Sequence, residues 1–184
     1  MTTTNKIKKW FDFDHIKEMQ INKWFDFEWL KKSELVELHD VDISKDPVRP
    51  ELDMKFRTSY GRKIYGLKHG EDIMAVMCFG FVNQIPKTVE DLDTFSKDAY
   101  LQATHRAGVQ GSIAIAYTVW SLKKGGGKMI VDEVYKMIKH SNHLNRLITL
   151  SPLTKMAEKF HVRNGAKLIQ KNETTQNFEY TVSK

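Results

Sequence analysis

The sequence lacks any apolar run long enough to cross a membrane, because its longest hydrophobic stretches have the length of single strands. The basic residues within positions 1–9 are not followed by an apolar segment, so no secretory signal is visible. Cys78 is the only cysteine and lies inside an apolar run, which is typical of a small buried hydrophobic residue and allows no internal disulfide. We therefore expect a cytoplasmic protein without a membrane partner.

Metal-binding and nucleic-acid-binding patterns are missing as well. The histidines at 105, 140 and 143 have no metal-ligand spacing with acids or with Cys78, so no metal is predicted. The net charge of +6 would suit nucleic acid, but the lysines are dispersed among acids and no recognised nucleic-acid motif appears. A basic rim would serve a cofactor with several phosphates equally well, and we do not expect nucleic acid as a main partner.

The first 45 residues differ in composition from the rest of the chain. The sequence KWFDFD at 9–14 returns as KWFDFE at 23–28, a shift close to four helical turns. Two copies are too few for a solenoid, so the aromatic clusters either share one helix face or end two short helices that cover a sheet. They could belong to the core, to a lid or to a partner-binding surface. We predict a helical, aromatic-rich extension over residues 1–45.

Residues 46–50, with two prolines, form an extended linker, because each proline restricts the residue before it. We therefore place a second domain over residues 46–184, and the pattern after the linker is rich in strands. Two apolar runs, 62–67 and 73–82, are separated by a short polar turn and predict a hairpin. Residues 113–119 are apolar on both faces, as expected of a central strand.

Two helices and three strands are predicted beyond this central strand. Apolar residues recur at helical spacing over 128–138, and a short strand follows at 147–150. Ser151-Pro152 predicts the N-cap and first turn of the next helix. That helix would have one apolar face and end at Asn164-Gly165, its apolar residues being Leu153, Met156, Ala157 and Phe160. The chain would close with a hairpin of strands at 166–170 and 177–182.

The most informative motif is a run of three glycines, 125–127, between the central strand and the helix. Glycines let the backbone approach a ligand closely, and the first amides of a helix have no internal acceptor. The helix dipole adds positive potential there, and lysines surround the run, namely Lys123, Lys124 and Lys128. This arrangement predicts phosphate binding, although a flexible turn is the alternative. A P-loop is excluded, because no Gly-Lys-Ser/Thr follows at the required spacing.

The order of strand, glycine loop, helix, strand, helix ending in FHVRNGA at 160–166, and terminal hairpin resembles the GNAT acyltransferase superfamily. The resemblance implies a mixed α/β fold, with a mostly antiparallel sheet flanked by helices, and an acyl-CoA such as acetyl-CoA or malonyl-CoA. It also implies that the glycine-loop amides hold the pyrophosphate and that the preceding strand holds pantetheine. The residues concerned are Thr118, Val119, Trp120, Lys124, Gly125, Gly126, Gly127 and Lys128. Leu122 stands where that loop usually has Gln or Arg.

Several segments also resemble the catalytic domain of malonyl-CoA decarboxylase, itself GNAT-like. They are TLSP at 149–152, FHVRNGA at 160–166, RKIY at 62–65 and NQIPKTV at 83–89, and the resemblance covers about residues 60–182. Only nine residues separate Ser151 from His161, whereas the decarboxylase has a long insertion there. Its helical amino-terminal domain is absent or replaced by residues 1–45.

The resemblance implies catalytic roles for His161 and Ser151. His161 would protonate a departing thiolate or the enolate left by decarboxylation, unless it is only a half-buried helix residue. Ser151 would hydrogen-bond the acyl carboxylate or the thioester carbonyl, and a helix N-cap is compatible with that role. Tyr180 could line the pocket or serve packing alone. Asn164 could orient the acyl group, although the helix stop accounts for it.

Three functions follow, with an acyl-CoA-dependent acyltransferase first. Amine acylation needs a base, and residues 113–120 contain neither an acid nor a histidine. Decarboxylation requires no such base, which favours a malonyl-CoA decarboxylase-like enzyme as the second hypothesis. A non-catalytic GNAT-like binding module is the third. The sequence leaves the acyl acceptor, and the choice between monomer and homodimer, open.

Overall fold

The computed structural model describes residues 33–182. Its strands are β1 (Glu34–Leu38), β2 (Lys63–His69), β3 (Asp72–Val82), β4 (Ile113–Ser121), β5 (Arg146–Thr149), β6 (Ser151–Pro152), β7 (Lys167–Lys171) and β8 (Thr175–Tyr180). Its α-helices are α2 (Met54–Thr58), α3 (Val89–Arg106), α4 (Gly126–His140) and α5 (Lys155–Arg163), with short 3-10 turns η1 (Ile43–Lys45) and η2 (Ser59–Gly61). Within this range no helix combines the length and the hydropathy needed to span a membrane.

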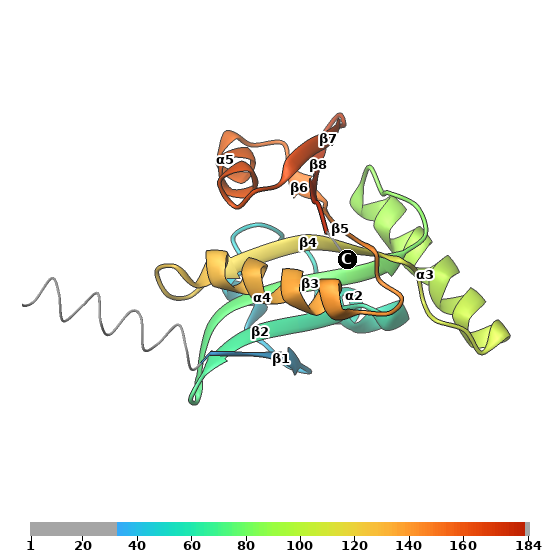
Figure 1. The fold of residues 1–184 in the computed structure, drawn as a ribbon, viewed down its shortest axis with the longest axis horizontal. Coiled ribbons are helices and arrows are strands. Elements are labelled where there is room, and N and C mark those ends of the chain that lie inside the picture. Colours follow the sequence, from blue (N-terminus) through green and yellow to red (C-terminus); the bar gives the residue numbers. More distant parts are fainter. Residues whose placement is uncertain (1–32, 183–184) are drawn as a thin grey trace, which may run out of the picture. The chain divides into compact units, whose positions relative to one another are not determined.

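The strands form one sheet in the order β1-β2-β3-β4-β5-β8-β6, with β7 paired to β8. Every pairing is antiparallel except that of β4 with β5 (Figure 1). β3 and β4 are apolar on both faces because helices α3 and α4 pack against them. This mixed, mostly antiparallel α/β architecture confirms the fold class predicted from the sequence.

The predicted hairpin, central strand, α4 and terminal hairpin are all present, and four features differ from the expectations. Ser151-Pro152 does not cap α5: it forms β6, which pairs with β8, and the cap is Thr154, whose hydroxyl accepts from the Ala157 amide at 3.2 Å. The predicted apolar face of α5 is not packed in the core, since Met156 is 79% exposed. The cause is that this face borders cavities, and His161 is the buried residue of the helix.

The other two differences concern helix α3 and the amino-terminal extension. We predicted no helix at α3, although Leu92, Ser96 and Ala99 are buried in it and Val89 and Phe95 pack against the core. Residues 34–38, which we placed in a helical extension, form β1, since their apolar residues pair with β2 at the edge of the sheet. The rest of that extension, including both aromatic clusters, lies outside the described residues.

Strands β4 and β5 diverge halfway along β4, and this divergence positions the site. Their parallel register ends at the pair Ala116 and Thr149, with the Leu150 amide donating to the Ala116 carbonyl at 2.9 Å. The next residue of β4, Tyr117, is the extra residue of a β-bulge opposite β3. β4 then continues to Ser121, whereas the segment that follows β5 turns away into β6. A wedge therefore opens beside residues 117–121.

A buried ion pair ties the segment before this wedge to β4. Asp46 and Arg57 are 2.9 Å apart and neither side chain is exposed. The Thr118 hydroxyl donates to the Asp46 carboxylate at 2.9 Å. The Arg57 Nε donates to the Leu52 carbonyl at 2.9 Å, so the buried guanidinium has several acceptors. These contacts hold the adjoining residues Pro47 and Val48 at the mouth of the wedge, where they line a cavity.

Candidate active site

Two adjoining cavities occupy the wedge between β4 and α5. The outer cavity, of about 960 Å³, lies between the glycine loop and α5. The inner cavity, of about 540 Å³, extends along β4 toward Ser151, His161 and Tyr180. Both are lined by Ser121, Gly127, Met156 and Phe160, so a ligand could extend from one into the other.

Each of the three loop positions requires glycine for a different structural reason. Gly125 caps α4 in the left-handed region at φ +86°, where residues with a Cβ are strained. Gly126 packs on β3, since a Cβ there would lie 2.7 Å from the Met74 carbonyl oxygen. Gly127 faces the cavities, and its backbone lies close to the Phe160 ring. The amides of Gly127 and Lys128 meet no acceptor within residues 33–182, as expected at a helix start.

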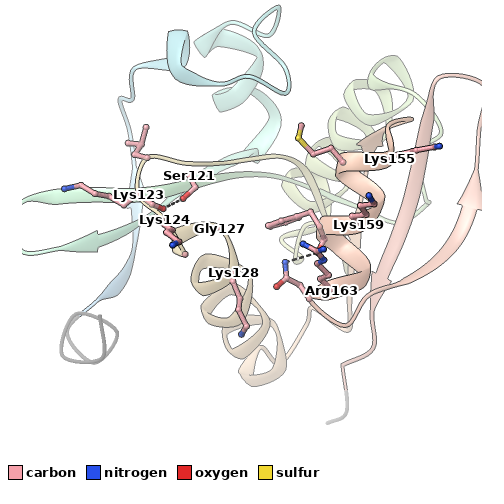
Figure 2. A pocket seen from close by; sticks show the side chains of 13 residues that line it. Ser121, Lys123, Lys124, Gly127, Lys128, Lys155, Lys159 and Arg163 are labelled. Atoms are coloured by element: carbon pink, nitrogen blue, oxygen red, sulfur yellow. Dashed lines mark hydrogen bonds between the residues drawn. The ribbon is translucent and has the colours of Figure 1, made fainter. Parts of the chain in front are cut away.

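The outer cavity is strongly basic. Six cationic side chains and no acidic one line it, from the loop and from α5 (Figure 2): Lys123, Lys124, Lys128, Lys155, Lys159 and Arg163. Lys123 lies 3.8 Å from Asp72, and Lys128 lies 2.6 Å from Asp132. The other four make no ion pair with any carboxylate of the described chain. With the free amides of the loop, they make the outer cavity suitable for an anion that carries several phosphates.

The inner cavity is mostly apolar, and no ionised side chain lines it. Thr118, Val119 and Trp120, the residues predicted to accompany pantetheine, all line it. The Thr118 hydroxyl itself is occupied by Asp46. The Tyr117 hydroxyl and the Trp120 indole N–H are buried and have no hydrogen-bond partner in the described structure. Both atoms are closed to solvent within the core, where Phe56 contacts the Tyr117 ring and Arg57 lies over Trp120, so they form the wall behind the cavity and offer no hydrogen bond to a ligand in it.

At the inner end, His161 joins two hydroxyl groups. Its Nε2 lies 2.7 Å from Ser151 Oγ, and its Nδ1 lies 2.9 Å from the Tyr180 hydroxyl oxygen. Ser151 Oγ is also 3.1 Å from Thr149 Oγ1. The imidazole stacks on Phe178 with ring centroids 5.1 Å apart. β5, β6, α5 and β8 therefore each contribute one side chain to a continuous network of hydrogen bonds.

Burial fixes the protonation states of this network. It lowers the pKa of His161 from its ordinary 6.5 to about 4, so the imidazole is neutral at pH 7. Burial likewise raises the pKa of Tyr180, so the phenol keeps its proton. If Tyr180 donates to Nδ1, then Nε2–H donates to Ser151; in the other tautomer Ser151 donates to Nε2 and Nδ1–H donates to Tyr180. Either way the network can present or pass on one proton without carrying net charge.

The structure thus brings Ser151 and His161 into contact, together with Tyr180. Asn164 ends α5, where its Nδ2 donates to the Phe160 carbonyl at 2.9 Å, and it also borders the outer cavity. Leu122 borders the same cavity and is 40% exposed.

Sequence reasoning missed Thr149 and the basic residues of α5. The latter have a signal in their spacing, since Lys155, Lys159 and Arg163 recur every four residues. The sequence contains no signal for a role of Thr149, because nothing distinguishes it from an ordinary threonine in a strand.

The fold and the wedge define a class: the described residues have the fold of the GNAT acyltransferases and GNAT-like decarboxylases, as the sequence resemblance implied. The GphF GNAT-like decarboxylase, in complex with isobutyryl-CoA, is similar with a TM-score of 0.55 at 8% identity, over 71% of this chain and 83% of that one. NAA60 of Arabidopsis thaliana, in complex with acetyl-CoA, is similar with a TM-score of 0.53 at 11% identity, over 80% and 97%.

A malonyl-CoA decarboxylase from Cupriavidus metallidurans is also similar, with a TM-score of 0.48 at 17% identity over 73% of this chain. The chain spans 35% of the length of that decarboxylase. No family model matches the sequence, and neither does any curated protein. The similarities to solved structures therefore establish the fold.

Proposed function

We propose that the protein binds an acyl-CoA thioester across the two cavities and removes the carboxylate from a carboxyacyl group such as malonyl. One observation carries this proposal: the inner cavity joins the neutral Ser151–His161–Tyr180 network to a lining without ionised side chains. A carboxylate placed there would lose its hydration and meet no cation. Loss of CO₂ would relieve that cost.

The ligand's orientation follows from the charges of the two cavities. The pyrophosphate would lie on the free amides of Gly127 and Lys128, with Lys124 beside it. The pantetheine arm would run along residues 117–120, which line the inner cavity beside the point where β4 and β5 diverge. The thioester would then reach His161 at the inner end. Gly125 and Gly126 support this arrangement indirectly, because they set the direction of the loop.

In the reaction, the bond between the α-carbon and the carboxylate breaks, and its electron pair forms the thioester enolate as CO₂ leaves. Hydroxyl or N–H donors of Ser151 and His161 would stabilise the enolate oxygen without any net charge of their own. The α-carbon then takes a proton that the network passes on and that solvent finally replaces. The products are CO₂ and the shortened acyl-CoA.

Acyl transfer, the first hypothesis from the sequence, is the second candidate. The observation that favours it is the Tyr180 hydroxyl at 2.9 Å from His161, because a linked pair of proton donors could protonate a departing thiolate. Direct attack by an ammonium group would need a base. The inner lining has no carboxylate, and a histidine with a pKa of about 4 is a weak base. This shortage places transfer behind decarboxylation.

The test is to incubate the full chain with malonyl-CoA or acetyl-CoA, without an amine, and to quantify the products by chromatography and mass spectrometry. We expect malonyl-CoA to become acetyl-CoA, and His161→Gln and Ser151→Ala to lower kcat about 100-fold or more. His140→Gln, at an exposed histidine, is the matched control and should retain activity.

Stable malonyl-CoA alongside consumption of acetyl-CoA once an amine is added would select transfer instead. Binding of both thioesters without turnover under either condition would leave only a CoA-binding module.

A further inference from the structure

Helix α5 presents a row of cations to the outer cavity. Lys155, Lys159 and Arg163 are spaced by four residues, so they share one face of the helix. All three are exposed and line the outer cavity, whereas Ala157 and His161 of the same helix line only the inner one. Figure 2 shows this row across the cavity from the lysines of the glycine loop.

This row is unfavourable for the protein by itself. Like charges four residues apart on a helix repel one another. Lys155 is the first residue of α5, where the helix dipole is already positive, and Thr154 supplies only a neutral cap. The three side chains also form no ion pair within residues 33–182. A bound anion would remove each of these costs.

Apolar side chains accompany the row. Met156 is 79% exposed and lies next to Lys155 in the chain, and Leu122 is 40% exposed in the loop that faces α5. Both line the outer cavity. A surface that combines exposed apolar side chains with several cations matches a ligand with a flat aromatic ring and phosphate groups, which is the chemistry of a nucleotide.

We propose that Lys155, Lys159 and Arg163 bind the 3′-phosphate of coenzyme A, with its adenine against Met156 and Leu122. This inference rests on the proposed function, which puts the pyrophosphate at the glycine loop and the thioester at His161. The phosphoadenosine is then the remaining part of the ligand, and it would lie against the α5 side of the outer cavity. The row on α5 makes the protein selective for thioesters of coenzyme A over thioesters whose carrier ends at the pantetheine phosphate.

The experiment measures binding of coenzyme A, 3′-dephospho-coenzyme A and 4′-phosphopantetheine to the full chain by isothermal titration calorimetry at low salt. We expect coenzyme A to bind about tenfold tighter than the dephospho form, since each exposed cation contributes a small increment. The double variant Lys159→Gln with Arg163→Gln should lose that preference while binding the dephospho form within about threefold of the wild-type value. Lys139→Gln, an exposed cation of α4 outside this cavity, is the matched control.

Equal affinity of the wild-type protein for coenzyme A and its dephospho form overturns the inference but leaves the proposed function intact. A double variant that keeps the full preference also overturns it. If 4′-phosphopantetheine bound as tightly as coenzyme A, the phosphoadenosine would contribute nothing to affinity, which again contradicts the role of α5. If none of the three compounds binds, the proposed function fails together with this inference.

Discussion

Acidification should destabilise this protein through His161 in particular. Burial among Phe178, Ser151 and Tyr180 lowers the pKa of the imidazole to about 4, compared with 6.5 in an unfolded chain. Between these two values the unfolded chain binds a proton that the native protein does not. The free energy of unfolding therefore falls as the pH drops from about 6.5 towards 4, and this contribution levels off below that.

The size of the effect follows from the two pKa values. The full difference corresponds to about 3 kcal/mol, of which about 1.4 kcal/mol is lost at pH 5.5 and about 2.5 kcal/mol at pH 4.5. His161 is 5% exposed, so solvent screening reduces these figures little. A loss of this size is a large fraction of the total stability of an average domain.

The assay is urea unfolding at pH 7, 5.5 and 4.5, for the wild-type protein and for His161→Gln. Other groups titrate in this range in both proteins, so only the difference between the two free energies is used. That difference should shrink by about 2.5 kcal/mol from pH 7 to pH 4.5, because the variant has no imidazole to protonate. His140→Gln removes an exposed imidazole and controls for the substitution itself. A difference that is constant with pH would refute the assignment of His161 as a buried neutral base.

Three further substitutions test other parts of the structure. Asp46→Asn should lower the free energy of unfolding by about 3–5 kcal/mol, since it leaves the Arg57 charge buried without its partner, and a loss below about 1 kcal/mol in urea would contradict the ion pair. Gly126→Ala should cost about 1–3 kcal/mol by pushing the loop off β3, and a melting temperature equal to wild type would disprove the close approach. Tyr180→Phe should lower kcat about tenfold or more with little change in coenzyme A affinity, and an unaltered kcat would remove Tyr180 from the His161 network.

Local patterns in the sequence were enough to predict the main strands, the glycine loop and the C-terminal hairpin. These features depend on periodicity, on turn residues and on the order of elements, all of which can be read along the chain. His161 and Ser151 were found by resemblance, and their contact could not be seen in the sequence. It arises because Ser151 of β6, His161 of α5 and Tyr180 of β8 come together only in the folded chain.

The misassignment of Ser151 shows the limit of this reasoning. A Ser-Pro pair before a helical pattern fits an N-cap, and it also fits a short strand followed by a turn. In the structure Ser151 and Pro152 pair with β8 as a short strand, and Thr154 is the N-cap of α5. Helix α3 was missed although Val89, Leu92 and Phe95 recur at helical spacing and pack on the core. Its exposed residues Tyr100 and Leu101 are apolar as well, so the apolar residues do not stand out as a single stripe.

The Asp46 carboxylate has a practical consequence for anyone dividing this chain. The two prolines that follow it suggest a fragment that begins at Pro47, and such a fragment would keep every side chain that lines either cavity. It would nevertheless separate the sheet from the strand that covers its β2 edge and from the acid that neutralises Arg57. Shortened versions of the protein should therefore begin ahead of Glu34, so that the part that contains both cavities retains the strand and the carboxylate on which its fold depends.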